Sequence, residues 1–316
     1  MNIDLNFFPG WTRKAITFTM DDGWLAMDVK FLETVRPAGI KGTFNIISNN
    51  STKYNDDELI RRTYEGFEIA NHVKLHPFAF ADGVDAPENA PIFDHDNADS
   101  ADVNLMYKDD CGVEGVYLRY SPTSKTWQRI ATAKGYIQLV KDCQKELEEL
   151  FGKGKIRGFV WPYTAQKNTE VTEYLKANFY GLRTAGIKEP LEDPAFALPT
   201  DRSNWQYNAR HKGLLQRAKE FEALDPQGEL KWFAFGVHSF DFDREGNWDE
   251  LAEFCKEFGG RNEFWYASNA EIFDYEDAVK VAVVENGTVK NNSDITLYAQ
   301  INGQNVTIPP HASVKV

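Results

Sequence analysis

The stretch AITFTMDDGW, residues 15–24, decides the fold class, because an apolar run passes directly into two adjacent carboxylates. Continuous apolar runs of this length are typical of strands that are buried on both faces of a parallel sheet. Asp21 and Asp22 are therefore expected at the carboxyl end of a strand, followed by a glycine. Taken alone, such a pair is more typical of a solvated turn or a helix cap than of a functional site.

Six more apolar runs follow along the chain, and segments with helical spacing lie between them. The seven predicted strands are residues 15–19, 43–47, 67–70, 158–161, 181–184, 232–237 and 263–266. Strands that alternate with helices favour a parallel sheet covered by helices, either as an open doubly wound sheet or as a barrel. The pattern alone leaves both architectures open.

One long segment interrupts this alternation after the third strand. Residues 77–127 are rich in Asp, Ala and Asn and contain the hairpin-like stretch GVYLRYSPTSKTW, with Ser121 and Pro122 at its turn. Because a structureless loop of this length is unusual, we expect an insertion with structure of its own beside the functional site.

The C-terminal segment has a different pattern. From residue 280 onward the apolar period becomes two, and Asn-Gly pairs at 286–287 and 302–303 are typical of tight hairpin turns. The sequence therefore predicts a main domain over residues 1–279 and a small C-terminal β appendage over residues 280–316.

Composition excludes several classes of function. The chain has 35 basic and 48 acidic residues, a net charge of -13, and this balance argues against nucleic-acid binding, which needs a basic face. No apolar stretch of about 18 residues occurs, so we expect no membrane-spanning segment. The N-terminal residues resemble no signal peptide, which predicts a cytoplasmic protein, or a periplasmic or extracellular one if a leader was removed.

The three cysteines argue against a disulfide framework. Cys111, Cys143 and Cys255 are odd in number, far apart and without CxxC spacing. Neither a set of disulfides nor a thiolate zinc site is expected from such a pattern, and buried thiols are the simpler interpretation.

Histidines follow two of the predicted strands. His72 and His76 come after the third strand, and a spacing of four residues places two imidazoles where one cation can bind both, although Pro77 favours a single turn or loop over a long helix. His238 follows the sixth strand, and Tyr163 follows the fourth. Because ligands of parallel α/β folds bind beyond the carboxyl ends of the strands, these residues are expected to meet Asp21 and Asp22 at one site.

Four motifs in this order make the chain resemble the polysaccharide deacetylases with a NodB-homology domain. They are TMDDG at 19–23, EIANHVKLHP at 68–77, WPY at 161–163 and VHSFD at 237–241. The resemblance covers residues 14 to about 275, outside the insertion and the tail. It implies an irregular (β/α)7 barrel, in agreement with seven predicted strands.

The resemblance also implies a metal-assisted hydrolysis of acetyl groups. Asp21 would be the catalytic base, and Asp22, His72 and His76 would hold one divalent metal ion. Zinc suits this ligand set, whereas iron, cobalt, nickel and manganese remain alternatives on ligand type. The backbone N–H of Tyr163 would stabilise the oxyanion and His238 would protonate the leaving group.

The chain departs from the family pattern at three positions. Val73 replaces the usual Ser or Thr after the first histidine, Val160 replaces the arginine that pairs with the catalytic base, and Gly236 replaces an apolar residue before His238. Arg157 and Arg183 are the possible substitutes for the missing arginine, and Arg183 is preferred because it lies at a strand end.

Further residues are expected near the substrate because of their residue types. Aromatic side chains suit the apolar faces of sugar rings, although most tryptophans pack in cores. The candidates for substrate contact are Trp24, Trp161, Arg183 and Asp241, and Asp241 or Asp201 is also expected to orient His238.

The sequence thus predicts a metal-dependent deacetylase that acts on an acetylated carbohydrate. Two alternatives stay open at this point: an amidase that cleaves a non-sugar C–N bond, and a non-catalytic carbohydrate-binding protein on the same fold. The sequence does not predict the sugar, the choice between N- and O-acetyl groups, or the oligomeric state.

Overall fold

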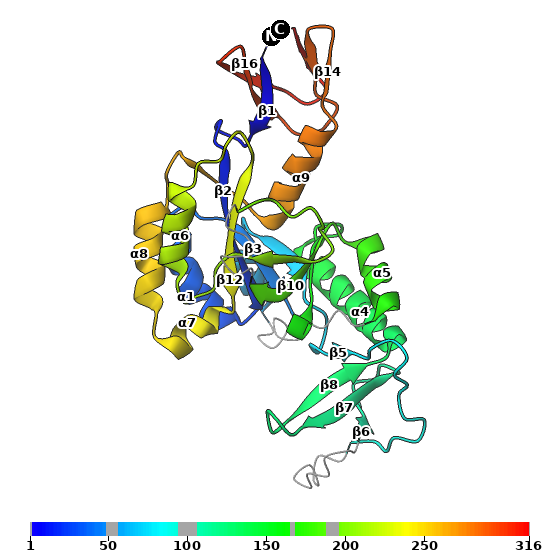
Figure 1. The fold of residues 1–316 in the computed structure, drawn as a ribbon. Coiled ribbons are helices and arrows are strands. Elements are labelled where there is room, and N and C mark those ends of the chain that lie inside the picture. Colours follow the sequence, from blue (N-terminus) through cyan, green and yellow to red (C-terminus); the bar gives the residue numbers. More distant parts are fainter. Residues whose placement is uncertain (1, 49–55, 94–105, 165–167, 188–195, 316) are drawn as a thin grey trace.

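An eight-stranded sheet forms the centre of the molecule, and all of its strand pairings are parallel (Figure 1). The computed structural model describes residues 2–48, 56–93, 106–164, 168–187 and 196–315. The sheet consists of β2 (Lys14–Asp22), β3 (Gly42–Ile46), β4 (Glu68–Asn71), β9 (Phe159–Val160), β10 (Leu182–Ile187), β11 (Trp205–Tyr207), β12 (Lys231–Val237) and β13 (Phe264–Tyr266). All seven predicted strands are therefore confirmed. The eighth, β11, was not predicted, because its three residues include a polar glutamine and form no apolar run.

Strand β2 is the longest strand of the sheet and carries the first motif. It pairs with β12 from Lys14 to Met20 on one side, and with β13 and then β3 on the other. Its apolar residues are buried on both faces, as expected for a central parallel strand. Asp21 and Asp22 are its last two residues, so they lie at the carboxyl edge of the sheet.

Helices cover the sheet on two sides. In Figure 1, α1, α6 and α8 lie on one side of the sheet, and α4 and α5 lie on the other. The helices are α1 (Leu25–Val35), α3 (Asp57–Thr63), α4 (Ala133–Phe151), α5 (Thr169–Asn178), α6 (Leu214–Ala223), α7 (Ser239–Glu245), α8 (Trp248–Phe258) and α9 (Asn269–Lys280), with a 3-10 turn at Pro162–Thr164. The structure is thus an α/β fold with a mostly parallel central sheet.

The two edges of this sheet approach each other. Strands β11 and β12 are its edge strands, and an isolated parallel bridge joins Ala209 to Phe235. The backbone N–H of Gly236 also donates to the carbonyl of Ala209 at 3.0 Å. A Cβ at Gly236 would overlap the carbonyl oxygen of Thr19, which explains a glycine at this position. Among the described residues, the edges meet through this bridge and not through a continuous ladder.

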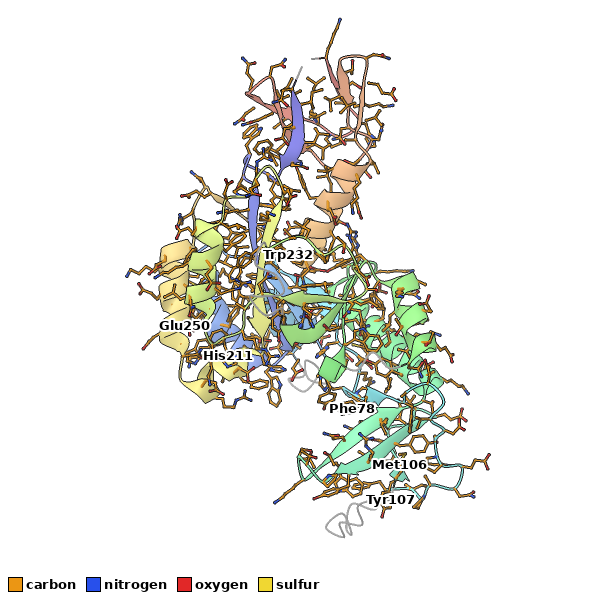
Figure 2. The ribbon with its side chains drawn as sticks, viewed as in Figure 1. Phe78, Met106, Tyr107, His211, Trp232 and Glu250 are labelled. Atoms are coloured by element: carbon orange, nitrogen blue, oxygen red, sulfur yellow. The ribbon has the colours of Figure 1, made fainter. Side chains whose placement is uncertain are left out.

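The insertion forms a second sheet. Its strands are β5 (Phe78–Ala79), β6 (Met106–Lys108), β7 (Val116–Ser121) and β8 (Thr126–Ala131), in the order β5-β8-β7-β6. The predicted hairpin is confirmed, because β7 and β8 pair antiparallel around the turn after Ser121. The sheet extends beyond the carboxyl edge of the central sheet (Figure 1), and Phe78 lies nearer the main body than Met106 and Tyr107 (Figure 2).

The C-terminal appendage lies at the opposite end of the molecule (Figure 1). It contains β14 (Val283–Glu285), β15 (Thr288–Lys290), β16 (Leu297–Ile301), β17 (Gln304–Ile308) and β18 (Ser313–Lys315), and both predicted Asn-Gly turns connect paired strands. Strand β1 (Ile3–Phe7) pairs with β16, so the N-terminal residues share a sheet with the appendage. This pairing was not predicted, and the division at residue 280 stays a prediction.

Two expectations from composition can be compared with the described residues. None of the helices in the described part of the chain is both long and apolar enough to cross a membrane. The three cysteines are free thiols; Cys143 and Cys255 are buried, as the sequence predicts, whereas Cys111 is half-buried.

Candidate active site

Three side chains from two loops meet at the carboxyl edge of the sheet. Asp22 ends β2, and His72 and His76 lie in the loop after β4. Asp22 Oδ1 lies 3.4 Å from His72 Nε2 and 3.6 Å from His76 Nε2, and the two Nε2 atoms are 3.1 Å apart. Within the described residues, this is the one group of at least three acidic, histidine or cysteine side chains arranged to hold a metal ion.

The backbone at this edge takes conformations that few residues adopt. Asp22, Val73, Leu75 and His76 all have positive φ, between 50° and 74°. The turn after β4 is stabilised by Asn71, whose side-chain oxygen accepts a hydrogen bond from the backbone N–H of Val73 at 2.9 Å. Asn71 thus supplies a side-chain hydrogen bond to this loop, although Val73 itself lacks the hydroxyl of the family pattern.

The imidazoles are oriented so that their Nε2 atoms point into the cluster. His72 Nδ1 lies 2.9 Å from the carbonyl oxygen of Val160, so an Nδ1–H donates there and Nε2 keeps its lone pair. Burial lowers the pKa of His76 to about 3, and the neighbouring His72 acts in the same direction. Two imidazole nitrogens and one carboxylate are a donor set that fits a divalent transition metal.

Asp22 is the charged member of the set. Burial alone would raise the pKa of Asp22, but His72, His238 and His76 outweigh it and hold the pKa well below its usual value. The indole Nε1–H of Trp24 also donates to Asp22 Oδ2 at 3.4 Å. The carboxylate is therefore ionised throughout the range in which proteins work.

Asp21 faces a different set of partners from its neighbour. Arg183 Nη2 donates to Asp21 Oδ1, and the amide of Asn45 donates to the same oxygen at 2.8 Å. Both Asp21 and Arg183 are buried, and the guanidinium lies 5.0 Å from the ring centroid of Tyr207. Burial raises the pKa of Asp21, but Arg183 and the nearby histidines outweigh this effect and lower it.

Of the two candidate arginines, Arg183 is the one that pairs with Asp21. Arg183, on β10, contacts Asp21, whereas Arg157 forms an exposed ion pair with Asp274. The preference for Arg183 over Arg157 thus agrees with the geometry. Arg183 is fully buried, so its guanidinium is not on a surface that a substrate reaches. The expected contact of Arg183 with substrate is therefore corrected: the side chain pairs with Asp21 instead.

His238 lies near the other carboxylate oxygen of Asp22. Its Nε2 lies 3.8 Å from Asp22 Oδ2, and its Nδ1 lies 2.9 Å from Asp241 Oδ2. Burial lowers the pKa of His238, but the hydrogen bond to Asp241 and the nearby aspartates raise it overall. Asp241 is buried and also pairs with Arg244, so it contacts His238 and is withdrawn from substrate. Asp201 instead bonds to Ser203 in an exposed turn.

Aromatic rings stand on both sides of the histidines. Tyr163 is 45% exposed, stacks on Phe78 with ring centroids 4.0 Å apart, and meets the ring of His76 at 4.4 Å. On the other side, Phe240 stacks on His238 at 4.6 Å. Trp24, which is 46% exposed, contacts the edge of Phe240 at 5.9 Å. These rings form two aromatic groups, one beside His76 and one beside His238.

One expected substrate contact is not supported by the structure. Trp161 is 1% exposed and packs between Tyr136 and Phe159, so its ring belongs to the core beneath the site. Trp161 is buried because it directly follows β9, which lies between two other strands of the sheet. The chain reaches the surface two residues later, at Tyr163.

Sequence reasoning missed three residues that contact the site: Asn45, Phe78 and Phe240. Asn45 is an amide in the middle of an apolar strand, and a polar residue in such a run is a signal that sequence reasoning can use. Phe240 lies inside the VHSFD motif, two residues after His238. Phe78 offered no signal, because its contact with Tyr163 joins segments that are far apart in the chain.

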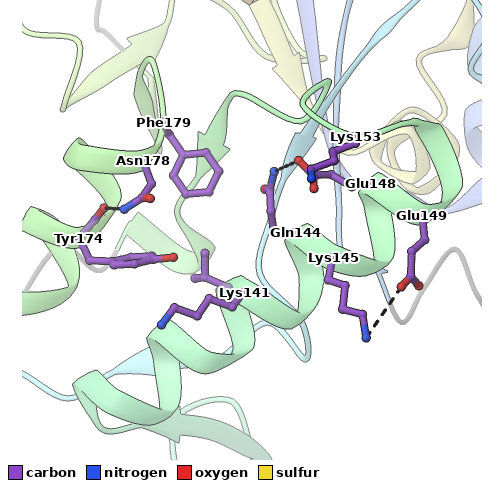
Figure 3. Close-up of a pocket in the computed structure, with 10 residues that line it drawn as sticks. Lys141, Gln144, Lys145, Glu148, Glu149, Lys153, Tyr174, Asn178 and Phe179 are labelled. Atoms are coloured by element: carbon purple, nitrogen blue, oxygen red, sulfur yellow. Dashed lines mark hydrogen bonds and ion pairs between the residues drawn. The ribbon is translucent and has the colours of Figure 1, made fainter.

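A groove elsewhere on the surface is separate from this cluster. It lies between α4 and α5, has a volume of about 390 Å³ and is lined by residues such as Lys141, Tyr174 and Phe179 (Figure 3). Lys145 and Glu149 form an ion pair of 3.8 Å at its rim. None of the residues around Asp22 lines the groove, so we do not assign it to the active site.

Comparisons with known proteins add independent information. A search of curated proteins found no match. Among solved structures, the chain is similar to a polysaccharide deacetylase from Bacillus cereus, at 16% identity over 81% of this chain and 92% of that one, with a TM-score of 0.43. It is also similar to a family 4 acetyl xylan esterase from Clostridium thermocellum in complex with a cobalt ion, at 11% identity over 83% and 92%, with a TM-score of 0.46.

A third solved structure is the Xyl-CE4 domain of a multidomain xylanase from the hindgut metagenome of Trinervitermes trinervoides, at 14% identity over 84% of this chain and 92% of that domain, with a TM-score of 0.44. The family model described as polysaccharide deacetylase matches residues 10–183, more than half of the chain, and this range contains Asp21, Asp22, His72 and His76. The chain therefore belongs to the polysaccharide deacetylase family.

Proposed function

We propose that the protein is a metal-dependent hydrolase that removes acetyl groups from an acetylated carbohydrate. The single observation that carries the proposal is the Asp22, His72 and His76 cluster, with its ligand atoms all within 4.8 Å of one another, inside the range matched by the family model. Asp21 and His238 lie beside this cluster, as a hydrolase of this kind needs an acid and a base next to its metal.

Asp22, His72 and His76 would hold one divalent cation. When bound, such a cation polarises an acetyl carbonyl and activates water near neutral pH. Zinc is the metal that we favour, because nitrogen and carboxylate ligands in a small open set suit it, with other first-row transition metals as alternatives. The hydrogen bond from His72 to the carbonyl of Val160 supports a ligand role for His72, because it fixes the orientation of the imidazole ring before a metal binds.

Asp21 would accept the proton of the attacking water. Its lowered pKa keeps the carboxylate ionised, and the fixed contacts to Arg183 and Asn45 hold it in one orientation. Arg183 also restricts how basic Asp21 becomes, because the ion pair favours the charged form. Asp21 is therefore a weak base that stays in its ionised, proton-accepting form.

His238 would donate a proton to the leaving nitrogen or oxygen. Its raised pKa, caused mainly by Asp241, increases the protonated fraction near neutral pH. The backbone N–H of Tyr163 is our candidate donor to the oxyanion, because its positive φ of 56° sets the peptide of this residue apart from the strand before it. The phenol of Tyr163 and the indole of Trp24 would contact the sugar.

The central sheet supports the proposed membership of the chain in the family's barrel fold. We propose that the central strands form the irregular barrel of the family, closed where Ala209 meets Phe235. The narrow packing at Gly236 agrees with a small barrel whose carboxyl end collects all the loops of the site.

The decisive experiment compares wild-type protein with the Asp21→Asn variant on N- and O-acetylated sugars. We expect acetate release from wild type and a loss of about 10²–10⁴-fold in kcat in the variant, because it lacks a general base. Metal content should stay near that of wild type. Asp249→Asn, an exposed aspartate in the first turn of α8, serves as the matched control and should keep full activity.

Two outcomes would replace this proposal. If simple amides are hydrolysed while no acetylated sugar is, the amidase alternative holds. If sugars bind without any acetate release by metal-loaded wild type, the protein is a carbohydrate-binding member of the family. Circular dichroism of the Asp21→Asn variant is needed in each case, because that substitution leaves the buried Arg183 without its carboxylate partner.

A further inference from the structure

A second buried carboxyl group lies close to the site, and the proposed reaction does not use it. Asp28 is on α1, is fully buried, and accepts hydrogen bonds from Ser239 Oγ at 2.5 Å and from Tyr64 Oη at 2.7 Å. A carboxyl group is costly to bury, so a short apolar side chain would fill this place more cheaply if packing were its only role.

The contacts of Asp28 connect the two loops that carry acid–base groups. Its backbone N–H donates to the carbonyl of Trp24 at 2.9 Å, in the first turn after the Asp21–Gly23 motif. Its side chain binds the hydroxyl of Ser239, which directly follows His238 and begins α7. One residue therefore joins the end of β2 to the end of β12 on the side where both enter the site.

We propose that Asp28 is a positioning residue that fixes His238 relative to Asp22 through the hydroxyl of Ser239. The inference rests on the proposed function, because it assigns the acid role to His238. The separation that it controls is the 3.8 Å between His238 Nε2 and Asp22 Oδ2. Tyr64 has a different part: its hydroxyl binds the other oxygen of Asp28 and ties it to the end of α3.

Electrostatics agree with a role close to the site. Burial raises the pKa of Asp28 to about 7, against the opposing hydrogen bonds from Ser239 and Tyr64. The charge of Asp22 raises that pKa further and His238 lowers it, so both groups lie within electrostatic range of the carboxyl. Asparagine has the shape of the neutral carboxyl form and can bond to both hydroxyls, whereas alanine can bond to neither.

The test uses two hydroxyl deletions on the same carboxyl group. Ser239→Ala removes the link to His238, and Tyr64→Phe removes the link to α3. We expect Ser239→Ala to lower kcat by about tenfold and Tyr64→Phe to lower it by less than about twofold, because a displaced acid group costs rate while remote packing does not. KM and metal content should change little in either variant.

Asp28 itself supplies the second comparison. Asp28→Ala should lower kcat by about 10²-fold, and Asp28→Asn should recover most of this loss. Equal losses of kcat in Ser239→Ala and Tyr64→Phe, with equal losses of Tm, would overturn the proposal in favour of general stabilisation. If Asp28→Ala does not fold, the Ser239→Ala and Tyr64→Phe pair decides alone.

A structural measurement separates this proposal from the proposed function. If wild-type protein releases no acetate, the proposed function fails, and the positioning role is then decided by crystal structures of the Ser239→Ala and Tyr64→Phe variants. Movement of His238 away from Asp22 by about 1 Å in Ser239→Ala but not in Tyr64→Phe supports it. An unchanged separation in both variants contradicts it, whatever the substrate proves to be.

Discussion

The active-site edge and the C-terminal appendage both need left-handed backbone, yet they obtain it with different residues. In the appendage, positive φ falls on the Asn-Gly pairs at 286–287 and 302–303 and on His311, and Gly, Asn and His adopt it more readily than most residues. At the site it falls on residues that include Val73, Leu75, His76 and Tyr163. Backbone strain of this kind is concentrated at functional sites in many proteins, although Trp11 and Phe196 also have positive φ outside this site.

The two regions also bury polar groups differently. In the appendage, the fully buried amide of Asn291 donates to the carbonyls of Ile295, Ile308 and Pro309. At the site, the buried groups are charged, as in the pair of Asp21 with Arg183. A neutral amide stabilises a small sheet without reactivity, whereas a buried ion pair supplies a charge whose position chemistry can use.

The largest expected effect comes from removing one of the proposed metal ligands. His72→Ala removes a buried imidazole that supplies one of the three proposed ligand atoms. We expect deacetylase activity to fall on the order of 10³-fold and bound metal to fall well below one ion per chain, measured by elemental analysis. His311→Ala, an exposed histidine of the appendage, is the control and should change neither quantity. Full metal content in His72→Ala would refute the ligand assignment.

The cluster of Asp22, His72 and His76 could be predicted because each residue belongs to a short motif. Asp22 follows an apolar strand, and His72 and His76 are four residues apart, so local spacing carried most of the information. The same holds for the Asn-Gly turns of the appendage. The seven central strands were predictable for a similar reason, since each is an apolar run that a parallel sheet buries on both faces.

The remaining features depend on contacts between distant segments. Strand β1 pairs with β16, where Ile3 lies opposite Ile301, and no local pattern indicates such a partner. Arg183 contacts Asp21 from a strand that follows it by about half the chain, so sequence indicated it only by its place at a strand end. The sequence alone gives Asp28 no feature that separates it from other polar residues of an amphipathic helix. Its partners Tyr64, at the end of α3, and Ser239, on α7, are brought close only by the fold.

Breaking the buried charge pair should cost more stability than breaking the buried amide. Arg183→Met leaves Asp21 without its main partner, which we expect to lower the free energy of unfolding by about 3–5 kcal/mol. Asn291→Ala leaves buried carbonyls unsatisfied and should lower it by about 1–3 kcal/mol. Only Arg183→Met should also reduce kcat. Urea unfolding measures the stability and acetate release measures the activity. If Arg183→Met and Asn291→Ala lose the same activity, the buried ion pair has no catalytic role that the buried amide lacks.

The free energy of unfolding should depend on pH because the buried carboxyl of Asp28 is destabilising when it is ionised. Because its pKa is raised from 3.8 to about 7 in the folded protein, the folded state holds this proton more tightly than the unfolded state. The stability from this group is complete below about pH 4 and is lost as the pH rises through about 7. Asp28→Asn, which does not titrate, should therefore gain stability relative to wild type between pH 5 and 8, as urea unfolding at each pH would show. A constant difference across this range would contradict the raised pKa.

The smallest effect is expected from Gly303→Ala, and Gly23→Ala makes the same substitution at the other end of the molecule. Gly303, in the second Asn-Gly turn, has a φ of 81° and open space where a Cβ would lie, so Gly303→Ala should cost only about 1–2 kcal/mol and leave activity unchanged. Gly23 has a similar φ of 73°, but a Cβ there would lie 2.9 Å from the side chain of Ile46. Gly23→Ala should therefore cost about 1–3 kcal/mol more and lower kcat by displacing Asp22. If both variants lose the same stability and keep full activity, the backbone of the site is no more constrained than that of the appendage.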